Sequence, residues 1–271
     1  MPPGHLLFKN LYMPTKIIYV FLFLTLGFSS CEKPNPDDNK DDDKTLPVPT
    51  GTMLFHLHTY IENNEVDGYN IVYTTDAGRQ ISLSIAQMYI SDIQVVKLDG
   101  SVLTLPDTIL LKTRETETYT AGKLPVGNYK GIRFKVGLSA ANDILNPLSS
   151  KDSSALNHPE MWFGNTAQPD GYVFMNVQGS IDTTSDLSGS MQAFSYKIGT
   201  AANYIQVNLP EQNFTILENQ AEYGHLLIDY SLLFSGIKLN EVANLSVGKM
   251  DNNSAVAQKI IANVPLMFKY E

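Results

Sequence analysis

The chain has 271 residues, a formal net charge of −9 at pH 7, 43% hydrophobic residues and one cysteine. This acidic balance argues against nucleic acid or anionic lipid headgroups as partners, because both require a basic protein face. A single cysteine cannot form a disulfide within the chain, so the fold must be stabilised by a hydrophobic core.

Residues 1–30 have the pattern of a lipoprotein signal peptide. Lys16 is followed by an apolar run, residues 17–28, which is shorter than the roughly 20 residues that span a bilayer. Two small serines then precede Cys31, which suits a signal peptidase and makes the Cys31 thiol the expected site of lipidation. A membrane-spanning or buried helix is the weaker alternative.

Residues 31–48 are expected to form a disordered, acidic tether behind the lipid. Residues 32–44 contain no apolar side chain to bury, so folding could not offset the entropy of ordering them. Such tethers resemble the surface-export signals of Bacteroidetes lipoproteins. We therefore expect an outer-membrane lipoprotein that faces the periplasm or the cell surface, although a plain solvated spacer fits the composition equally well.

Residues 49–271 predict one all-β domain, an antiparallel β-sandwich with a long irregular loop. Alternating side chains and turn residues carry this prediction, as in the strand 53–60 and the Asp99-Gly100 hairpin turn. Residues 81–98 fit two strands or one bulged strand. Further strands are predicted at 102–105, 109–112, 129–136, 172–177, 191–198, 204–209, 225–234 and 260–268. The proline-containing residues 139–171 predict a long loop with at most short helical turns, and such loops are often functional.

His56 and His58 are the strongest candidates for chemistry. Residues two apart on a strand project from the same face, close enough for two imidazoles to share one metal ion. A third ligand must come from elsewhere, and His158 in the long loop, beside Met161 and Trp162, would suit copper. The alternative is that His56 and His58 are ordinary polar residues on the wet face of an edge strand.

Trp162 is the only tryptophan in the chain. From composition alone, the simpler interpretation is that it closes one end of the hydrophobic core.

Several segments, taken together and in order, resemble the copper-binding MbnP-like domain of exported bacterial proteins over roughly residues 50–240. The matching stretches are residues 55–58, 88–93, 99–100, 124–129, 132–137, 161–162, 171–174 and 228–236. This resemblance implies a β-sandwich that binds copper through histidine, here His56 or His58. It also implies that a dihaem peroxidase-type partner oxidises a tryptophan, here Trp162, to kynurenine, which then joins the metal site.

Two functions from different classes remain open. The favoured one is a lipid-anchored, extracytoplasmic copper-binding protein, with His56, His58, His158 and Trp162 as candidate ligands. The alternative is a metal-free structural or ligand-recognition module on the same sandwich. An enzyme is not expected, because the sequence has no G-x-S-x-G, P-loop or H-E-x-x-H motif.

Overall fold

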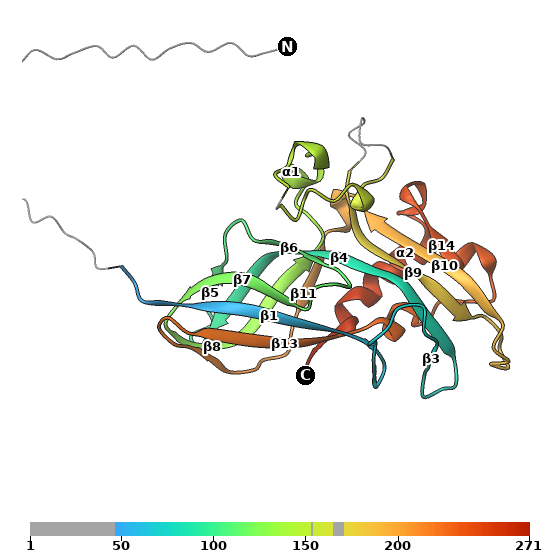
Figure 1. The fold of residues 1–271 in the computed structure, drawn as a ribbon, viewed down its shortest axis with the longest axis horizontal. Coiled ribbons are helices and arrows are strands. Elements are labelled where there is room, and N and C mark those ends of the chain that lie inside the picture. Colours follow the sequence, from blue (N-terminus) through green and yellow to red (C-terminus); the bar gives the residue numbers. More distant parts are fainter. Residues whose placement is uncertain (1–46, 153, 165–170) are drawn as a thin grey trace, which may run out of the picture. The chain divides into compact units, whose positions relative to one another are not determined.

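The computed structural model describes residues 47–152, 154–164 and 171–271 (Figure 1). The predicted signal peptide, the lipidation site Cys31 and the tether up to residue 46 lie outside the described residues. Within the described ranges, no helix is both long and apolar enough to cross a membrane.

Strands are the main regular secondary structure of the described residues. They are β1 (Thr50–Ile61), β2 (Asn64–Glu65), β3 (Tyr73–Thr74), β4 (Gln80–Lys97), β5 (Val102–Thr104), β6 (Ile109–Lys112), β7 (Thr118–Pro125), β8 (Gly127–Val136), β9 (Val173–Asp182), β10 (Met191–Gly199), β11 (Ile205–Asn208), β12 (Phe214–Ile216), β13 (Ala221–Asp229), β14 (Ser246–Val247) and β15 (Phe268–Tyr270). The α-helices are α1 (Ala140–Asp143) and α2 (Ala255–Asn263), and short 3-10 turns connect other elements.

These strands form two sheets that share one core, which confirms the predicted β-sandwich. Among the described residues, one sheet has five strands in the order β15-β13-β1-β2, with β7 also paired to β1. The other has ten, with β11-β8-β4-β9-β10-β14 as its main order and β3, β5, β6 and β12 attached to β4 or β8. Both sheets are mixed rather than purely antiparallel, because β13 runs parallel to β1 and β14 runs parallel to β10.

Burial along β1 explains which of its residues face the core. Every second residue is buried, and Phe55 packs against Phe134 of the opposite sheet with ring centroids 6.3 Å apart. This period of two is that of a strand with one face on the core. The intervening residues, His56 and His58 among them, therefore project from the outer face of the five-stranded sheet.

The long loop and the last predicted strand test the sequence pattern further. The described part of residues 139–171 holds only the short helix α1 and two 3-10 turns, as expected.

The strand predicted at 260–268 is wrong: α2 and a 3-10 turn occupy most of it. Ser254 caps α2 by accepting a hydrogen bond from the Ala257 N–H, and the buried Ala257, Ile260 and Val264 follow the helical spacing of three and four residues.

The strand predicted at 225–234 is correct only in its first half. β13 ends at Asp229, whose carboxylate accepts a hydrogen bond from the Ser231 N–H and begins a 3-10 turn over Tyr230–Phe234. A side chain that bonds the backbone two residues ahead competes with strand pairing, and this local contact was not visible in the alternation of apolar residues.

Candidate metal centre

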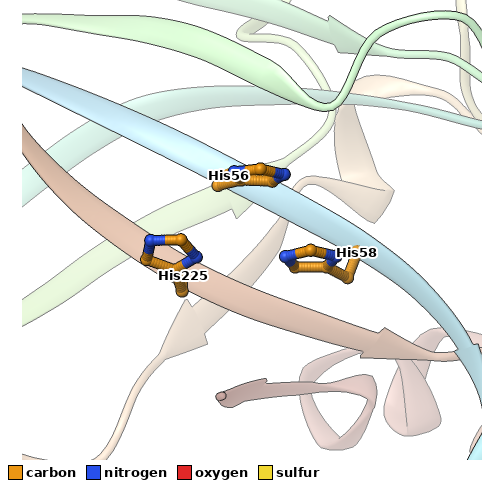
Figure 2. A group of neighbouring side chains, drawn as sticks. All are labelled: His56, His58 and His225. Carbon is orange, nitrogen blue, oxygen red and sulfur yellow. The ribbon is translucent and has the colours of Figure 1, made fainter. Parts of the chain in front are cut away.

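Three histidines meet on the outer face of the five-stranded sheet (Figure 2). His56 and His58 lie on β1, and the parallel pairing of β1 with β13 sets His225 directly beside His56. One ligand nitrogen from each ring lies within 4.8 Å of the others. The sheet therefore supplies the group of three imidazoles that a shared metal ion needs.

The three rings lie nearly parallel. The His56 and His58 centroids are 4.4 Å apart, with 6° between the ring planes, and the His56 and His225 centroids are 5.1 Å apart at 23°. Figure 2 shows a nitrogen of His58 facing a nitrogen of His225 across the gap between the strands. Because the side chains already lie this close, rotations about side-chain bonds are enough to bring three nitrogens toward one ion.

A carboxylate orients each ring. Glu65 Oε1 lies 2.8 Å from His58 Nδ1, and Glu117 Oε2 lies 3.4 Å from His56 Nε2. Glu271 Oε2 lies 3.3 Å from His225 Nδ1. A ring nitrogen that donates to a carboxylate leaves the lone pair on the other nitrogen, which is the arrangement that holds metal-binding histidines in place.

The second nitrogen of His58 has no hydrogen bond. His58 Nε2 is buried, and the nearest carboxylate oxygen, of Glu271, lies 3.7 Å away, too far for a hydrogen bond. Burying a polar atom without a partner costs about 1–3 kcal/mol. A metal ion would satisfy this lone pair, so the residues present fit a bound metal.

Exposure rises across the cluster from His58 to His225. The exposed fraction of the side chain is 15% for His58, 25% for His56 and 46% for His225. His225 is therefore the ring through which solvent or an external ligand reaches the cluster.

The donor set favours a borderline transition metal over a hard cation. Imidazole nitrogen suits copper, zinc, iron and nickel, and the affinity of a given site for divalent ions reaches its maximum at copper. The flanking carboxylates of Glu65, Glu117 and Glu271 add negative charge, which further favours a dication over a neutral ligand.

The structure does not bring His158 and Trp162 to this cluster, so the expected convergence with the long loop is wrong. His158 Nδ1 pairs with Glu160 at 2.7 Å. Trp162 is buried and packs edge-on against Tyr172, with centroids 4.7 Å apart. The loop instead joins the other sheet, because residues 159–161 contact β9 and Trp162 forms a β-bridge with Tyr172. This is the core-closing role that composition alone suggested.

His225, at the start of the strand predicted over residues 225–234, is a functional residue that the sequence pattern does not identify as a ligand. Tyr223 and His225 are two residues apart, which places both side chains on one face of a strand. The pairing of β13 with β1, however, joins residues that lie far apart in the chain. No local pattern encodes that register, so sequence reasoning could supply only two of the three rings.

Comparison with known proteins gives a family and one structural match. Residues 50–251 match the family model described as MbnP. A solved structure, MbnP from Methylosinus trichosporium, aligns at 17% identity with a TM-score of 0.48 and covers 69% of this chain and 78% of that chain. No curated protein matches the chain significantly.

Proposed function

This chain belongs to the MbnP family, and from that premise we propose that it is an extracytoplasmic copper-binding protein with His56, His58 and His225 as its ligands. The protein acts in this proposal as a metal-binding module and not as an enzyme. Copper is favoured because three imidazoles are its ordinary nitrogen donors and because family membership agrees with that chemistry.

One observation carries the proposal. Three imidazoles from two strands converge within 4.8 Å, and the most buried of them keeps a nitrogen without a hydrogen bond. An ordinary polar surface would leave each ring solvated. A bound copper ion would take one lone pair from each ring, and the carboxylates behind them would fix which nitrogen is available.

The test is copper content after chelator competition. Purified protein is loaded with one equivalent of Cu(II), dialysed against a weak chelator and measured for copper by mass spectrometry. The wild type should retain about one ion for each chain, whereas His225→Ala and the His56→Ala, His58→Ala double variant should retain almost none, because two ligands rarely close a site.

His158→Ala is the matched control, because it removes a histidine that pairs with Glu160 away from the cluster. It should retain copper as the wild type does. A wild type without copper, or a His158→Ala variant that loses the metal while His225→Ala keeps it, would overturn the assignment.

We further propose that Cys31 carries lipid and anchors the protein in the outer membrane. The apolar run, the two serines and the acidic tether support this reading of the sequence. Mass spectrometry of the membrane-extracted protein should find an acylated N-terminal cysteine. A Cys31→Ala variant should appear in the soluble fraction, and recovery of that variant with the membrane would contradict the anchor.

The resemblance also leads us to propose that a dihaem peroxidase-type partner oxidises Trp162. Conversion of tryptophan to kynurenine exchanges one carbon for one oxygen, so the peptide that contains Trp162 would gain a defined mass in protein isolated from its native cell. An unmodified Trp162 peptide from that source would argue against the partner.

A further inference from the structure

A small cavity lies between the two sheets, near the end of β1. Thr59 lines it from the buried face of β1, two residues after the core residue Leu57. Lys112 lines it from the other sheet, where it pairs with the core residue Met88 of β4. Paired residues of neighbouring strands share a face, so Lys112 also points into the space between the sheets. The two sheets therefore contribute facing side chains to one cavity of about 170 Å³.

Lys112 brings a buried positive charge to this cavity. Its side chain is 2% exposed, and its Nζ donates to the Thr113 carbonyl oxygen at 2.8 Å. Glu117 and Glu115 stabilise the charge only in part, and none of the described carboxylates forms an ion pair with it. A buried charge without an opposite partner is costly. An anion beside Lys112 would therefore stabilise the fold.

Two hydroxyl groups in the lining lack hydrogen-bond partners. Thr59 is 7% exposed, and both its Oγ1 and the Tyr69 Oη are buried without a hydrogen bond. Burial raises the pKa of Tyr69 to about 12 and the Thr59 hydroxyl opposes this rise, so the two groups are neighbours. Each hydroxyl carries one O–H donor. Both can donate to an acceptor atom placed in the cavity.

Arg114 supplies a second cation, at the exposed side of the cavity. Its guanidinium carbon lies 5.0 Å from the centre of the Tyr69 ring, and it too forms no ion pair with a carboxylate that the structure describes. Packing on an aromatic face orients a guanidinium and leaves its N–H groups to bind oxygen atoms. The cavity therefore combines two cations with two hydroxyl donors, which together suit an oxyanion.

The carboxylates of the lining narrow the class of oxyanion. Glu65 and Glu117 each place an oxygen beside a histidine ring on the outer face of the sheet, 2.8 Å from His58 and 3.4 Å from His56. Asp67 is exposed and adds an acceptor at the cavity. An anion that keeps an O–H group can donate to Asp67, whereas an anion with acceptors alone is repelled by it. Hydrogen phosphate has such a group and sulfate does not.

We propose that this cavity binds hydrogen phosphate. Lys112 and Arg114 balance its charge, the hydroxyls of Thr59 and Tyr69 donate to its oxygens, and Asp67 accepts a hydrogen bond from its O–H. The volume is below the roughly 300–1,000 Å³ of sites for drug-sized molecules, which favours the free ion over a phosphate ester. The site is separate from the proposed copper centre and requires no metal.

The test is calorimetry with metal-free protein at pH 7.5, with the ionic strength held constant by sodium chloride. Inorganic phosphate is the probe, sulfate is the matched ion without an O–H, and glycerol 3-phosphate represents phosphate esters. About one phosphate should bind each chain, at least about tenfold more tightly than sulfate, a difference of about 1.4 kcal/mol. Glycerol 3-phosphate should bind more weakly than phosphate.

Two variants remove donors from the cavity while nearly keeping their shape. Lys112→Met removes the buried charge, and Thr59→Val removes a hydroxyl that has no partner, so both should fold without phosphate. Lys112→Met should weaken phosphate binding by about tenfold or more, and Thr59→Val by about fivefold, a loss of about 1 kcal/mol. Arg133→Gln is the control for a lost cation, because Arg133 is an exposed residue of β8 outside the cavity, and it should bind phosphate as the wild type does.

Four results would overturn the proposal. These are no phosphate binding to the wild type, sulfate or glycerol 3-phosphate binding as tightly as phosphate, unchanged affinity in both cavity variants, and an Arg133→Gln variant that loses as much affinity as Lys112→Met. The last result would assign the binding to the overall charge of the protein, since a lost surface cation would then matter as much as the buried one.

Discussion

The ring of His58 depends on Glu65 for its orientation. Glu65 Oε1 lies 2.8 Å from Nδ1, which places the lone pair on the buried Nε2. Glu65→Gln keeps the size of the side chain but weakens the hydrogen bond to His58 Nδ1. The amide of the glutamine can also donate to Nδ1, which favours the His58 tautomer with its proton on Nε2. Loss of such a supporting carboxylate typically costs 10- to 100-fold in metal affinity, and we expect copper affinity to fall by about that factor.

Chelator competition gives the affinity, and circular dichroism shows whether the fold is intact. Glu218→Gln serves as the control for a lost charge, since Glu218 is exposed on the connection between β12 and β13. If both variants lost affinity equally, long-range charge would explain the effect and the orienting role of Glu65 would be wrong.

Lys112 is a buried cation that opposes folding at neutral pH. Its side chain is 2% exposed and donates to the Thr113 carbonyl oxygen, and burial lowers its pKa to about 8 against the partial opposition of Glu117 and Glu115. The folded pKa lies below the unfolded value of 10.5. Between about pH 8 and 10.5 the unfolded chain therefore binds more protons than the folded chain does. The free energy of unfolding consequently rises with pH over this range.

Lys112→Met removes this buried charge at nearly constant volume. At pH 7 the variant should be more stable than the wild type by about 2–3 kcal/mol, and the difference should shrink as the pH rises toward 10. Urea unfolding at pH 7 and pH 10 measures it. The exposed Lys269→Met is the control, for which the difference should not change with pH; an equally pH-independent difference for Lys112→Met would refute the argument.

At the scale of single elements, the sequence was informative where side chains alternate along one strand, and it failed at residues 260–268, where α2 replaces the predicted strand. Alternation placed His56 and His58 together on the outer face of β1, and the phase change within residues 81–98 corresponds to one bulged strand, β4. What it could not supply is register between distant strands. The pairing of His56 with His225 depends on how the whole sandwich closes, and so does the attachment of the long loop to the other sheet.

β9 approaches the backbone of β4 closely at Gly179. A Cβ at this position would collide with the Ser82 carbonyl oxygen and lie 3.1 Å from the Leu83 Cα, next to the register shift between Leu83 and Ile85. Backbone atoms of a central strand pair cannot move aside without breaking the ladder. Gly179→Ala should therefore destabilise the fold by about 2–3 kcal/mol.

Gly131→Ala is the matched substitution within the same sheet. Its Cβ would meet only Val96 side-chain atoms at 3.7 Å, an ordinary contact, so its melting temperature should stay close to that of the wild type. Gly179→Ala should melt about 5–10 °C lower. Similar melting temperatures for the two variants would show that β4 and β9 can separate at little cost.

At the scale of the whole molecule, the proposed metal joins strands that lie far apart in the chain. β1 begins the described fold and β13 comes near its end, yet they lie side by side (Figure 1). An ion held by His56, His58 and His225 would act as a cross-link between them. A ligand that binds only the folded state stabilises it by about 2.7 kcal/mol at 100 times its dissociation constant.

Copper at that excess should raise the melting temperature of the wild type by about 5–10 °C, and a strong chelator should reverse the change. Hydrogen exchange should slow mainly in β1 and β13, while β10 and β14 of the other sheet, which lack the histidine cluster, should change little. His225→Ala should show neither effect. If copper stabilised this variant as much as the wild type, the ion would have to bind elsewhere. The proposed cross-link requires all three rings, which the paired strands β1 and β13 carry.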